Sequence, residues 1–177
     1  MTNLPIPIQI LLAATVLIAA GTDIRKREIP NWLTFGAILA GLVAHPALSG
    51  WAGLKLSVVG FLVAALIFLP LFALRFLGGG DVKLMGAIGA LAGTDGLLVV
   101  FLLDALLAGL AAIVLIVVRG RVRQTLRNIA TGLRSITKGR APHEDNPEME
   151  AGSERSLGMP RGVTIALATL LLLFGMH

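Results

Sequence analysis

Long runs of apolar residues constrain this chain more than any other feature of its sequence. Four runs each approach the length of a membrane-spanning helix, which needs about 20 mostly apolar residues, and they cover residues 4–22, 32–49, 54–76 and 97–118. Hydrophobic residues make up 56% of the chain and charged residues only 14%, a composition that a soluble domain of this length does not carry. We therefore expect an all-α membrane protein that crosses the bilayer several times.

Two further apolar segments are shorter. Residues 163–177 are just long enough to cross, whereas residues 82–93 have the length of a re-entrant or buried helix. The basic residues decide between the possible topologies. If both segments cross, all of the 15 Lys and Arg residues except Lys55 lie on one side, as the positive-inside rule requires of the cytoplasmic side. We predict six transmembrane helices, with both termini on the non-cytoplasmic side and the first run retained as a span.

One sizeable loop, residues 119–161, interrupts the apolar pattern. Its first half is basic and its second half acidic, so we expect a surface segment that contacts anionic headgroups and continues as a linker. Because this loop lies between the fifth and sixth predicted spans, residues 1–177 are expected to form a single transmembrane domain. Trp32 and Trp51 flank the second run, where indole rings anchor a span at the membrane surface. The net charge of +5 is attributed to topology and lipid contact, and we expect no nucleic-acid partner.

Aspartates at the ends of two predicted spans are the candidates for chemistry. The chain has no cysteine and its three histidines are far apart, so we expect no thiolate site, no metal and no cofactor. Asp23 ends the first span and Asp81 begins the fourth, which places both at the cytoplasmic face. Two carboxylates that lie close together cannot both ionise cheaply, so they share a proton and titrate as a unit. One can take a proton from water while the other donates one to a peptide carbonyl, as in aspartic proteases.

Three consecutive glycines precede Asp81 in the segment FLGGGDVKLMGAIG. Without Cβ atoms, Gly78, Gly79 and Gly80 allow a substrate backbone to come close. They also allow the loop to take positive φ and to turn the Asp81 side chain inward. The more ordinary interpretation is that Asp81 is the N-cap of a helix that starts at Val82. Capping and catalysis are compatible.

The remaining residues near this segment have open or structural interpretations. Lys83 either favours the ionised form of Asp81 by proximity or extends toward the lipid headgroups. Asp104, inside the fifth span, is expected in the non-cytoplasmic half, away from the pair, as a neutral or hydrogen-bonded structural acid. The small residues around Gly89 and Gly93 are expected to pack helices closely.

The segment GGGDVKLMGAIGALAG resembles the extended GxGD signature of the type IV prepilin peptidases, a family of intramembrane aspartyl proteases. The segment DIRKREIPNWLT, which begins at Asp23, is similar to the block that carries the family's first catalytic aspartate, and MPRGVTIALA resembles the start of its last span. The resemblance implies that Asp23 and Asp81 are the catalytic pair, without saying which is the base. It also implies removal of the basic leader from prepilins or pseudopilins at the cytoplasmic face of the bacterial inner membrane.

Two departures distinguish this chain from the family pattern. Larger members carry an extra cytoplasmic region, often with paired cysteines, and also methylate the new N-terminus. This chain has no cysteine and looks like the short form found with Flp/Tad-type pili, so we expect a peptidase without N-methyltransferase activity. Arg161 stands where an aromatic residue is common. The alternatives are a small proton- or cation-coupled transporter, with Asp23, Asp81 and Asp104 as its relay, and a non-catalytic scaffold for pilus assembly.

Overall fold

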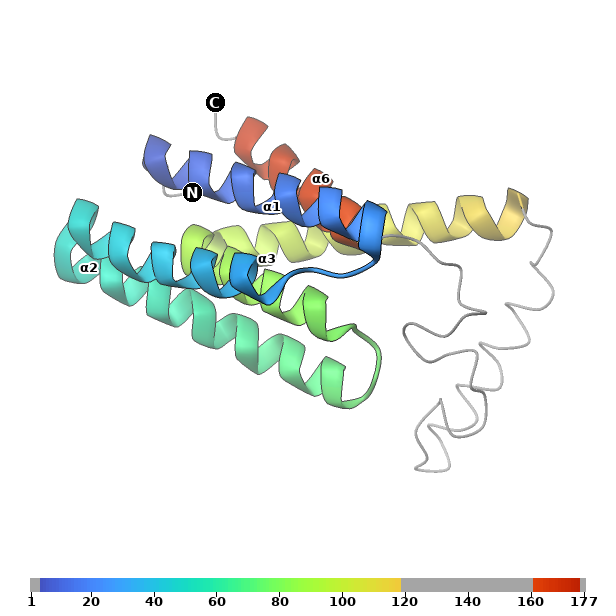
Figure 1. Ribbon diagram of the computed structural model, residues 1–177, viewed down its shortest axis with the longest axis horizontal. Helices are drawn as coiled ribbons and strands as arrows, with labels where there is room; N and C mark the ends of the chain where they lie inside the picture. Colours follow the sequence, from blue (N-terminus) through green and yellow to red (C-terminus); the bar gives the residue numbers. More distant parts are fainter. Residues whose placement is uncertain (1–3, 119–160, 176–177) are drawn as a thin grey trace.

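The computed structural model describes residues 4–118 and 161–175, and within these ranges all regular structure is helical (Figure 1). The helices are α1 (Ile6–Lys26), α2 (Asn31–Ala73), α3 (Gly79–Val118) and α6 (Arg161–Phe174). By length and composition α1, α2 and α3 are able to cross a membrane, and α6 is a shorter apolar helix. The all-α prediction is confirmed for these residues. The surface segment predicted in the 119–161 loop lies outside them, except for Arg161, which begins α6.

Both α2 and α3 turn back on themselves at a glycine. They have 43 and 40 residues, about twice what is needed to cross a hydrocarbon core of about 30 Å at about 1.5 Å per residue. The backbone leaves the helical conformation at Gly50 (φ 57°, ψ −140°) and at Gly93 (φ 69°, ψ −176°), where a side chain would be strained. Figure 1 shows the chain reversing at these points. Each helix is therefore a pair of antiparallel arms joined by a single residue.

The first arm of α3, residues 79–92, lies inside the bundle. Every residue from Leu84 to Gly93 is buried. The arm packs directly against the backbone of α2, because a Cβ at Gly60 would fall on the carbonyl oxygen of Gly89 and a Cβ at Gly89 on that of Gly60. At Gly41 a Cβ would lie 2.7 Å from the carbonyl oxygen of Ala90. The close packing predicted for these small residues is confirmed.

Two buried side chains of α2 complete the hydrogen bonding where α3 breaks. The last carbonyl groups before Gly93 have no partner in their own helix. His45 Nε2 lies 2.8 Å from the carbonyl oxygen of Leu91, and Ser57 Oγ donates a 2.8 Å bond to that of Ala90. A carbonyl only accepts, so the imidazole carries its proton on Nε2. Because a bilayer interior offers no water to replace these bonds, they stabilise the reversal.

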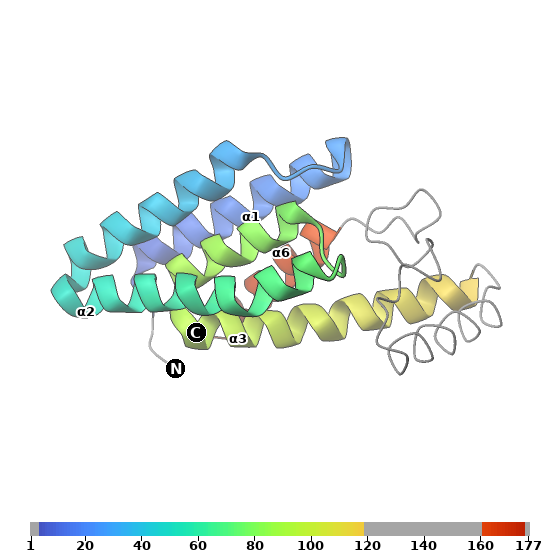
Figure 2. The ribbon, with the colours of Figure 1, turned by 90° about the horizontal axis from the view of Figure 1, so that it is seen from below.

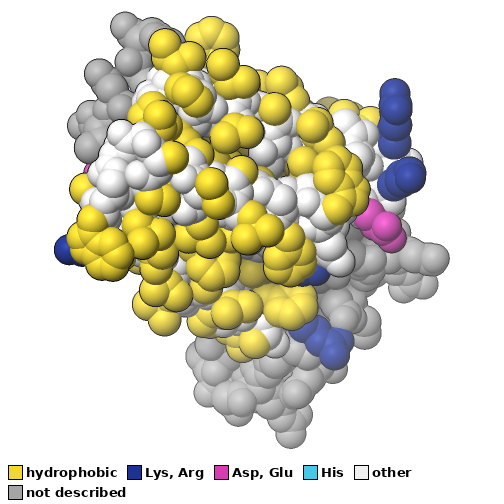
Figure 3. Space-filling model, turned by 60° about the vertical axis from the view of Figure 1, so that its left-hand side comes forward, with side chains coloured by type: hydrophobic (Ala, Val, Ile, Leu, Met, Phe, Trp, Pro, Cys, Tyr) yellow, Lys and Arg dark blue, Asp and Glu magenta, His cyan; other side chains and the backbone are white. Residues whose placement is uncertain are grey.

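The outer surface of the bundle is apolar. Leu66, Leu106 and Phe174 are 76%, 64% and 78% exposed, and Figure 3 shows hydrophobic side chains covering one face, with Lys and Arg at its edges. An apolar surface of this extent is suited to lipid chains and not to water. Trp32, near the start of α2, and Trp51, just after the reversal at Gly50, are exposed, as their sequence positions predict.

The two ends of the helix bundle differ in which helices begin and terminate there. At one end, which we call the loop end, α1 terminates, α2 begins and terminates, and α3 and α6 begin (Figures 1 and 2). The reversals at Gly50 and Gly93 lie toward the opposite end, where α1 begins and α6 terminates. The largest interface joins α2 to α3, and α6 packs against both α1 and α3. Asp23 and Asp81 both belong to the loop end.

Candidate active site

Asp23 lies in the last turn of α1, with its side chain 9% exposed. Its Oδ2 accepts a 2.8 Å hydrogen bond from the backbone N–H of Gly162, in the first turn of α6. The first N–H groups of a helix have no partner in that helix and form its positive end, so a carboxylate is a favourable acceptor there. A Cβ at Gly162 would lie 3.0 Å from Asp23 Oδ2. Glycine at this position therefore permits the close approach.

Left-handed residues end both helices that lead into the site. Arg27 (φ 53°) caps α1, and its N–H donates to the carbonyl oxygen of Asp23 at 2.9 Å. Arg75 (φ 60°) follows α2, and the N–H of Phe76 donates to the carbonyl oxygen of Leu71 at 2.9 Å. Caps of this kind normally use glycine, and a residue with a side chain costs about 1–2 kcal/mol there. Hydrogen-bonded turns thus fix the directions in which the chain leaves α1 and α2.

Asp81 lies in the first turn of α3, which begins at Gly79 and not at Val82. Gly78 holds the N-cap position, since its carbonyl oxygen accepts from the N–H of Val82 at 3.3 Å. The Asp81 carboxylate reaches back to the backbone of Gly78 with a hydrogen bond, as the third residue does in a capping box. The suggestion that Asp81 is itself the N-cap is therefore wrong. Its charge still favours the helix start.

The glycine triplet does not adopt the backbone conformation expected of it. Among the described residues, positive φ occurs at two glycines and two arginines elsewhere and at none of Gly78, Gly79 and Gly80, and the last two are helical. The prediction of positive φ is wrong here. Close approach does occur at Gly80, where a Cβ would lie 3.2 Å from the Cβ of Ile29, a buried residue of the loop after Asp23. This approach joins the two aspartate-bearing segments.

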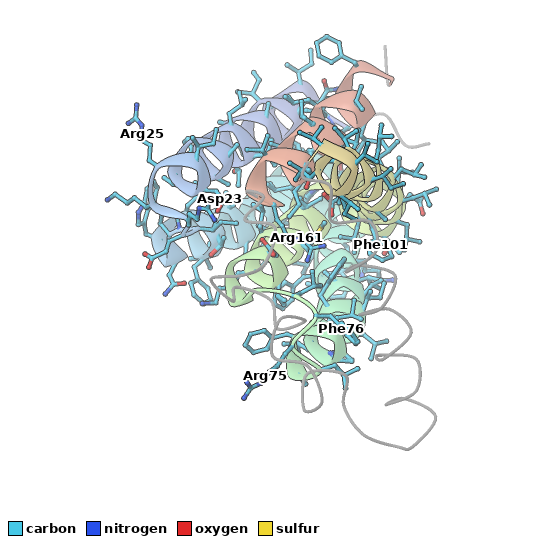
Figure 4. The ribbon with its side chains drawn as sticks, turned by 90° about the vertical axis from the view of Figure 1, so that its right-hand side faces the viewer. Asp23, Arg25, Arg75, Phe76, Phe101 and Arg161 are labelled. Carbon is cyan, nitrogen blue, oxygen red and sulfur yellow. The ribbon has the colours of Figure 1, made fainter. Side chains whose placement is uncertain are left out.

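The structure brings the two predicted aspartates within electrostatic reach of each other. The charges of Arg161, Asp23 and Asp104 all act on Asp81, which is partly exposed. Arg161 also reaches the 74–78 connection, where its guanidinium donates a 3.4 Å hydrogen bond to the carbonyl oxygen of Phe76. In Figure 4 the Asp23 and Arg161 side chains lie among the helix ends, whereas Arg25 points outward. A carboxylate pair beside one guanidinium can share a proton without a large net charge.

Asp104 lies nearer to the pair than expected. Its side chain is 6% exposed, forms a hydrogen bond with Thr164 and feels the charge of Arg161. Asp81 and Asp104 lie at nearly equal sequence distances on either side of Gly93. The reversal at Gly93 therefore brings them to about the same level along the axis of the bundle. The expectation that Asp104 lies in the opposite half is wrong, because the second arm of α3 extends well past the start of the first.

Lys83 makes a contact that neither prediction for it included. Its Nζ donates a 2.8 Å hydrogen bond to Oδ1 of Asn31, in the first turn of α2. This bond ties the start of α3 to the segment that follows Asp23. Sequence reasoning did not single out Asn31, although it lies in the IPN part of the motif, and it missed Gly162 in the same way. Among the residues that the structure describes, no group of three His, Asp or Glu side chains is placed to hold a metal ion.

The sequence profile of the type IV leader peptidase family matches residues 10–113, more than half of the chain and including Asp23 and Asp81. Over 122 residues the chain is 28% identical to the "Prepilin leader peptidase/N-methyltransferase" of Xanthomonas campestris pv. campestris. The alignment covers 66% of this chain and 42% of that protein, so the chain spans less than half the length of this curated relative. No solved structure matches the chain.

Proposed function

This chain belongs to the type IV leader peptidase family and is a multi-pass membrane protein, and from that premise we propose that it is an intramembrane aspartic endopeptidase with Asp23 and Asp81 as its catalytic pair. The observation that carries the proposal is the convergence of these two carboxylates at the loop end, where the charge of one acts on the other. In the proposed reaction one carboxylate takes a proton from the attacking water. The other donates a proton to the scissile carbonyl.

The surroundings of the pair support this chemistry. The Gly162 N–H holds Oδ2 of Asp23, and we propose that Oδ1 binds the attacking water. The Arg161 charge balances part of the negative charge around Asp81. Both aspartates lie at helix ends and not in the middle of the bundle, so water has a short path to them. Gly78 and Gly79, which precede Asp81 without side chains, are proposed to let a substrate backbone approach the carboxylate.

The proposed substrate is a prepilin or pseudopilin, cut between its basic cytoplasmic leader and its hydrophobic helix. The family description and the name of the Xanthomonas relative both support a leader peptidase of this kind. That relative's name includes a second activity, N-methylation, and we propose that this chain has only the first. Gly80 and Lys83 are proposed to support the site by joining its two segments, through Ile29 and Asn31 respectively.

The proposed topology has six crossings: α1, the two arms of α2, the two arms of α3, and α6. Of the basic residues that the structure describes, only Lys55 belongs to the end opposite the site. The positive-inside rule then supports a cytoplasmic loop end in the bacterial inner membrane, with the basic residues near anionic headgroups and both termini on the other side. We propose that residues 1–177 form one domain. Because the chain has no cysteine, single cysteines at Arg25 and Lys55 report the sidedness directly through labelling with a membrane-impermeant maleimide.

Cleavage of a co-expressed prepilin tests the proposed function. Wild type, Asp23→Asn and Asp81→Asn are compared by the mass of the pilin, and Asp95→Asn serves as the matched control because Asp95 is exposed just after the Gly93 reversal, away from the site. We expect leader removal without the mass of an added methyl group in wild type and in the control, and no cleavage in either site variant. Cleavage by a folded Asp23→Asn or Asp81→Asn protein would contradict the catalytic pair. A wild type that cuts no prepilin encoded near it would favour the transporter or scaffold alternatives.

A further inference from the structure

Asp104 is a buried acid that the two-aspartate reaction does not use. It belongs to the second arm of α3, and its side chain is 6% exposed. Its Oδ1 has no hydrogen-bond partner among the described residues. Burying a carboxyl group is costly unless other groups satisfy it. A contact of the other carboxyl oxygen of Asp104 is therefore the one that can offset this cost.

That contact is with Thr164, one turn into α6. Thr164 is also 6% exposed, and its Oγ1 donates a 2.9 Å hydrogen bond to the carbonyl oxygen of Arg161 while taking part in a hydrogen bond with Asp104. A hydroxyl has one hydrogen to donate and two lone pairs to accept with, so while that hydrogen goes to the Arg161 carbonyl, the bond with Asp104 requires a protonated carboxyl that donates to Oγ1. Asp104 is thereby connected to the first turn of α6 by side chains that water does not reach.

The first turn of α6 is also where the catalytic pair is held. The Gly162 N–H bonds Asp23, and the charge of Arg161 acts on Asp81 as well as on Asp104. Residues at the start of a helix have fewer internal hydrogen bonds than those in its middle, so outside contacts decide where this turn lies. A displacement of this turn would therefore move a donor away from Asp23 and a positive charge away from Asp81 together.

We propose that Asp104 is a positioning residue for the Asp23–Asp81 pair: its hydrogen bond to Thr164 fixes the first turn of α6. Asp104 acts through Thr164 and Gly162 and touches no substrate. The inference rests on the proposed peptidase activity for its kinetic consequence, whereas its structural consequence can be measured without any substrate.

The kinetic arm compares four variants with purified protein and a prepilin substrate. Asp104→Leu and Thr164→Val remove the hydrogen bond, and we expect each to lower kcat by about tenfold or more with KM nearly unchanged, since small displacements of catalytic groups are this costly. Asp104→Asn retains a hydrogen-bonding group of the same shape and is expected to restore most of kcat. Thr169→Val is the matched control, because the Thr169 hydroxyl is buried in the same helix and, among the described residues, bonds Ile165 of its own helix.

The structural arm uses the absence of native cysteines. In the Val163→Cys background, the rate of alkylation by a water-soluble maleimide reports the opening of the first turn of α6. We expect Asp104→Leu and Thr164→Val to raise this rate several-fold, and Asp104→Asn and Thr169→Val to leave it unchanged. If Asp104→Leu does not fold in detergent, Thr164→Val carries the same comparison.

The outcomes separate this inference from the proposed function. If no prepilin is cleaved by wild type while the alkylation pattern is as expected, the peptidase proposal fails and the positioning of α6 stands. If Thr164→Val keeps the wild-type kcat and alkylation rate, the positioning role is overturned. An Asp104→Asn protein as inactive as Asp104→Leu would also overturn it, because the charge of Asp104 and not its hydrogen bond would then be required.

Discussion

The backbone N–H of Gly162 donates a 2.8 Å hydrogen bond to Oδ2 of Asp23, so the last helix of the chain holds a carboxylate of the first. The two residues are 139 positions apart. Gly162 lies outside residues 10–113, the range that the family profile matches. The candidate site therefore includes three segments: the end of α1, the start of α3 and the start of α6.

A side chain at position 162 is expected to impair catalysis without unfolding the protein. In Gly162→Ala the new Cβ would lie 3.0 Å from Oδ2 and from the Cβ of Asp23, so the carboxylate or the helix must shift. We expect kcat to fall by about tenfold to hundredfold, as for other small displacements of catalytic groups. Gly21→Ala is the control, since Gly21 precedes Asp23 by two residues and a Cβ there meets nothing within 4 Å. Equal kcat values for the two variants would contradict the role of this contact.

Alanine at Gly60 is expected to destabilise the bundle. Its Cβ would fall on the carbonyl oxygen of Gly89, in the buried arm of α3, so the two helices must separate. Overpacking of this kind costs about 1–3 kcal/mol and more where backbone is the obstacle. Thermal unfolding in detergent measures the effect, with Gly36→Ala as the control because Gly36 is in the same helix and faces open space. Similar melting temperatures for the two variants would rule out a tight contact between Gly60 and Gly89.

Removal of the Ser57 hydroxyl is expected to weaken the reversal at Gly93. Ser57→Ala leaves the carbonyl oxygen of Ala90 without its 2.8 Å donor, and a buried acceptor without a partner costs about 1–3 kcal/mol. Thr169→Val also deletes a buried hydroxyl, but the carbonyl oxygen of Ile165 keeps its helical partner. Unfolding in detergent should therefore show a lower melting temperature for Ser57→Ala than for Thr169→Val. The reverse order would mean that Ala90 has another donor.

The contact between Lys83 and Asn31 is expected to couple the two aspartate-bearing segments. Lys83→Met and Asn31→Ala each remove the 2.8 Å hydrogen bond, and we expect each to lower kcat/KM several-fold. The double variant should have about the same kcat/KM as the less active single variant, which corresponds to a coupling energy of about 0.5–1.5 kcal/mol. Additive losses in this cycle would show that the two residues act independently.

The sequence predicts the helices of this fold well because their signal is local. The apolar run at residues 97–118 lies inside α3 and ends where that helix ends, and the run at residues 4–22 overlaps most of α1, which begins and ends a few residues later. The reversal at Gly50 lies between the predicted runs 32–49 and 54–76, and the reversal at Gly93 falls on the last residue of the predicted segment 82–93. Charge bias then predicts that Asp23 and Asp81 share one end, and the structure brings the two within electrostatic reach of each other.

The details of the site depend on contacts that local patterns do not contain. Gly162 with Asp23 and Lys83 with Asn31 join residues 139 and 52 positions apart. The height of Asp104 depends on the unequal lengths of the two arms of α3, which hydropathy alone does not resolve. The positive φ expected in the glycine triplet is found instead at Arg27 and Arg75, where hydrogen bonds to the preceding helices hold the turns.

The single-residue reversals at Gly50 and Gly93 also determine where this protein tolerates added sequence. One residue inserted beside either glycine would rotate the following arm by about 100° and turn part of its buried face outward. The same insertion between α3 and α6, in residues 119–160, changes neither the register of the arms of α3 nor that of α6. An epitope tag or a fluorescent domain is therefore best inserted in that connection, and insertions at the end of the bundle opposite the loop end are to be avoided.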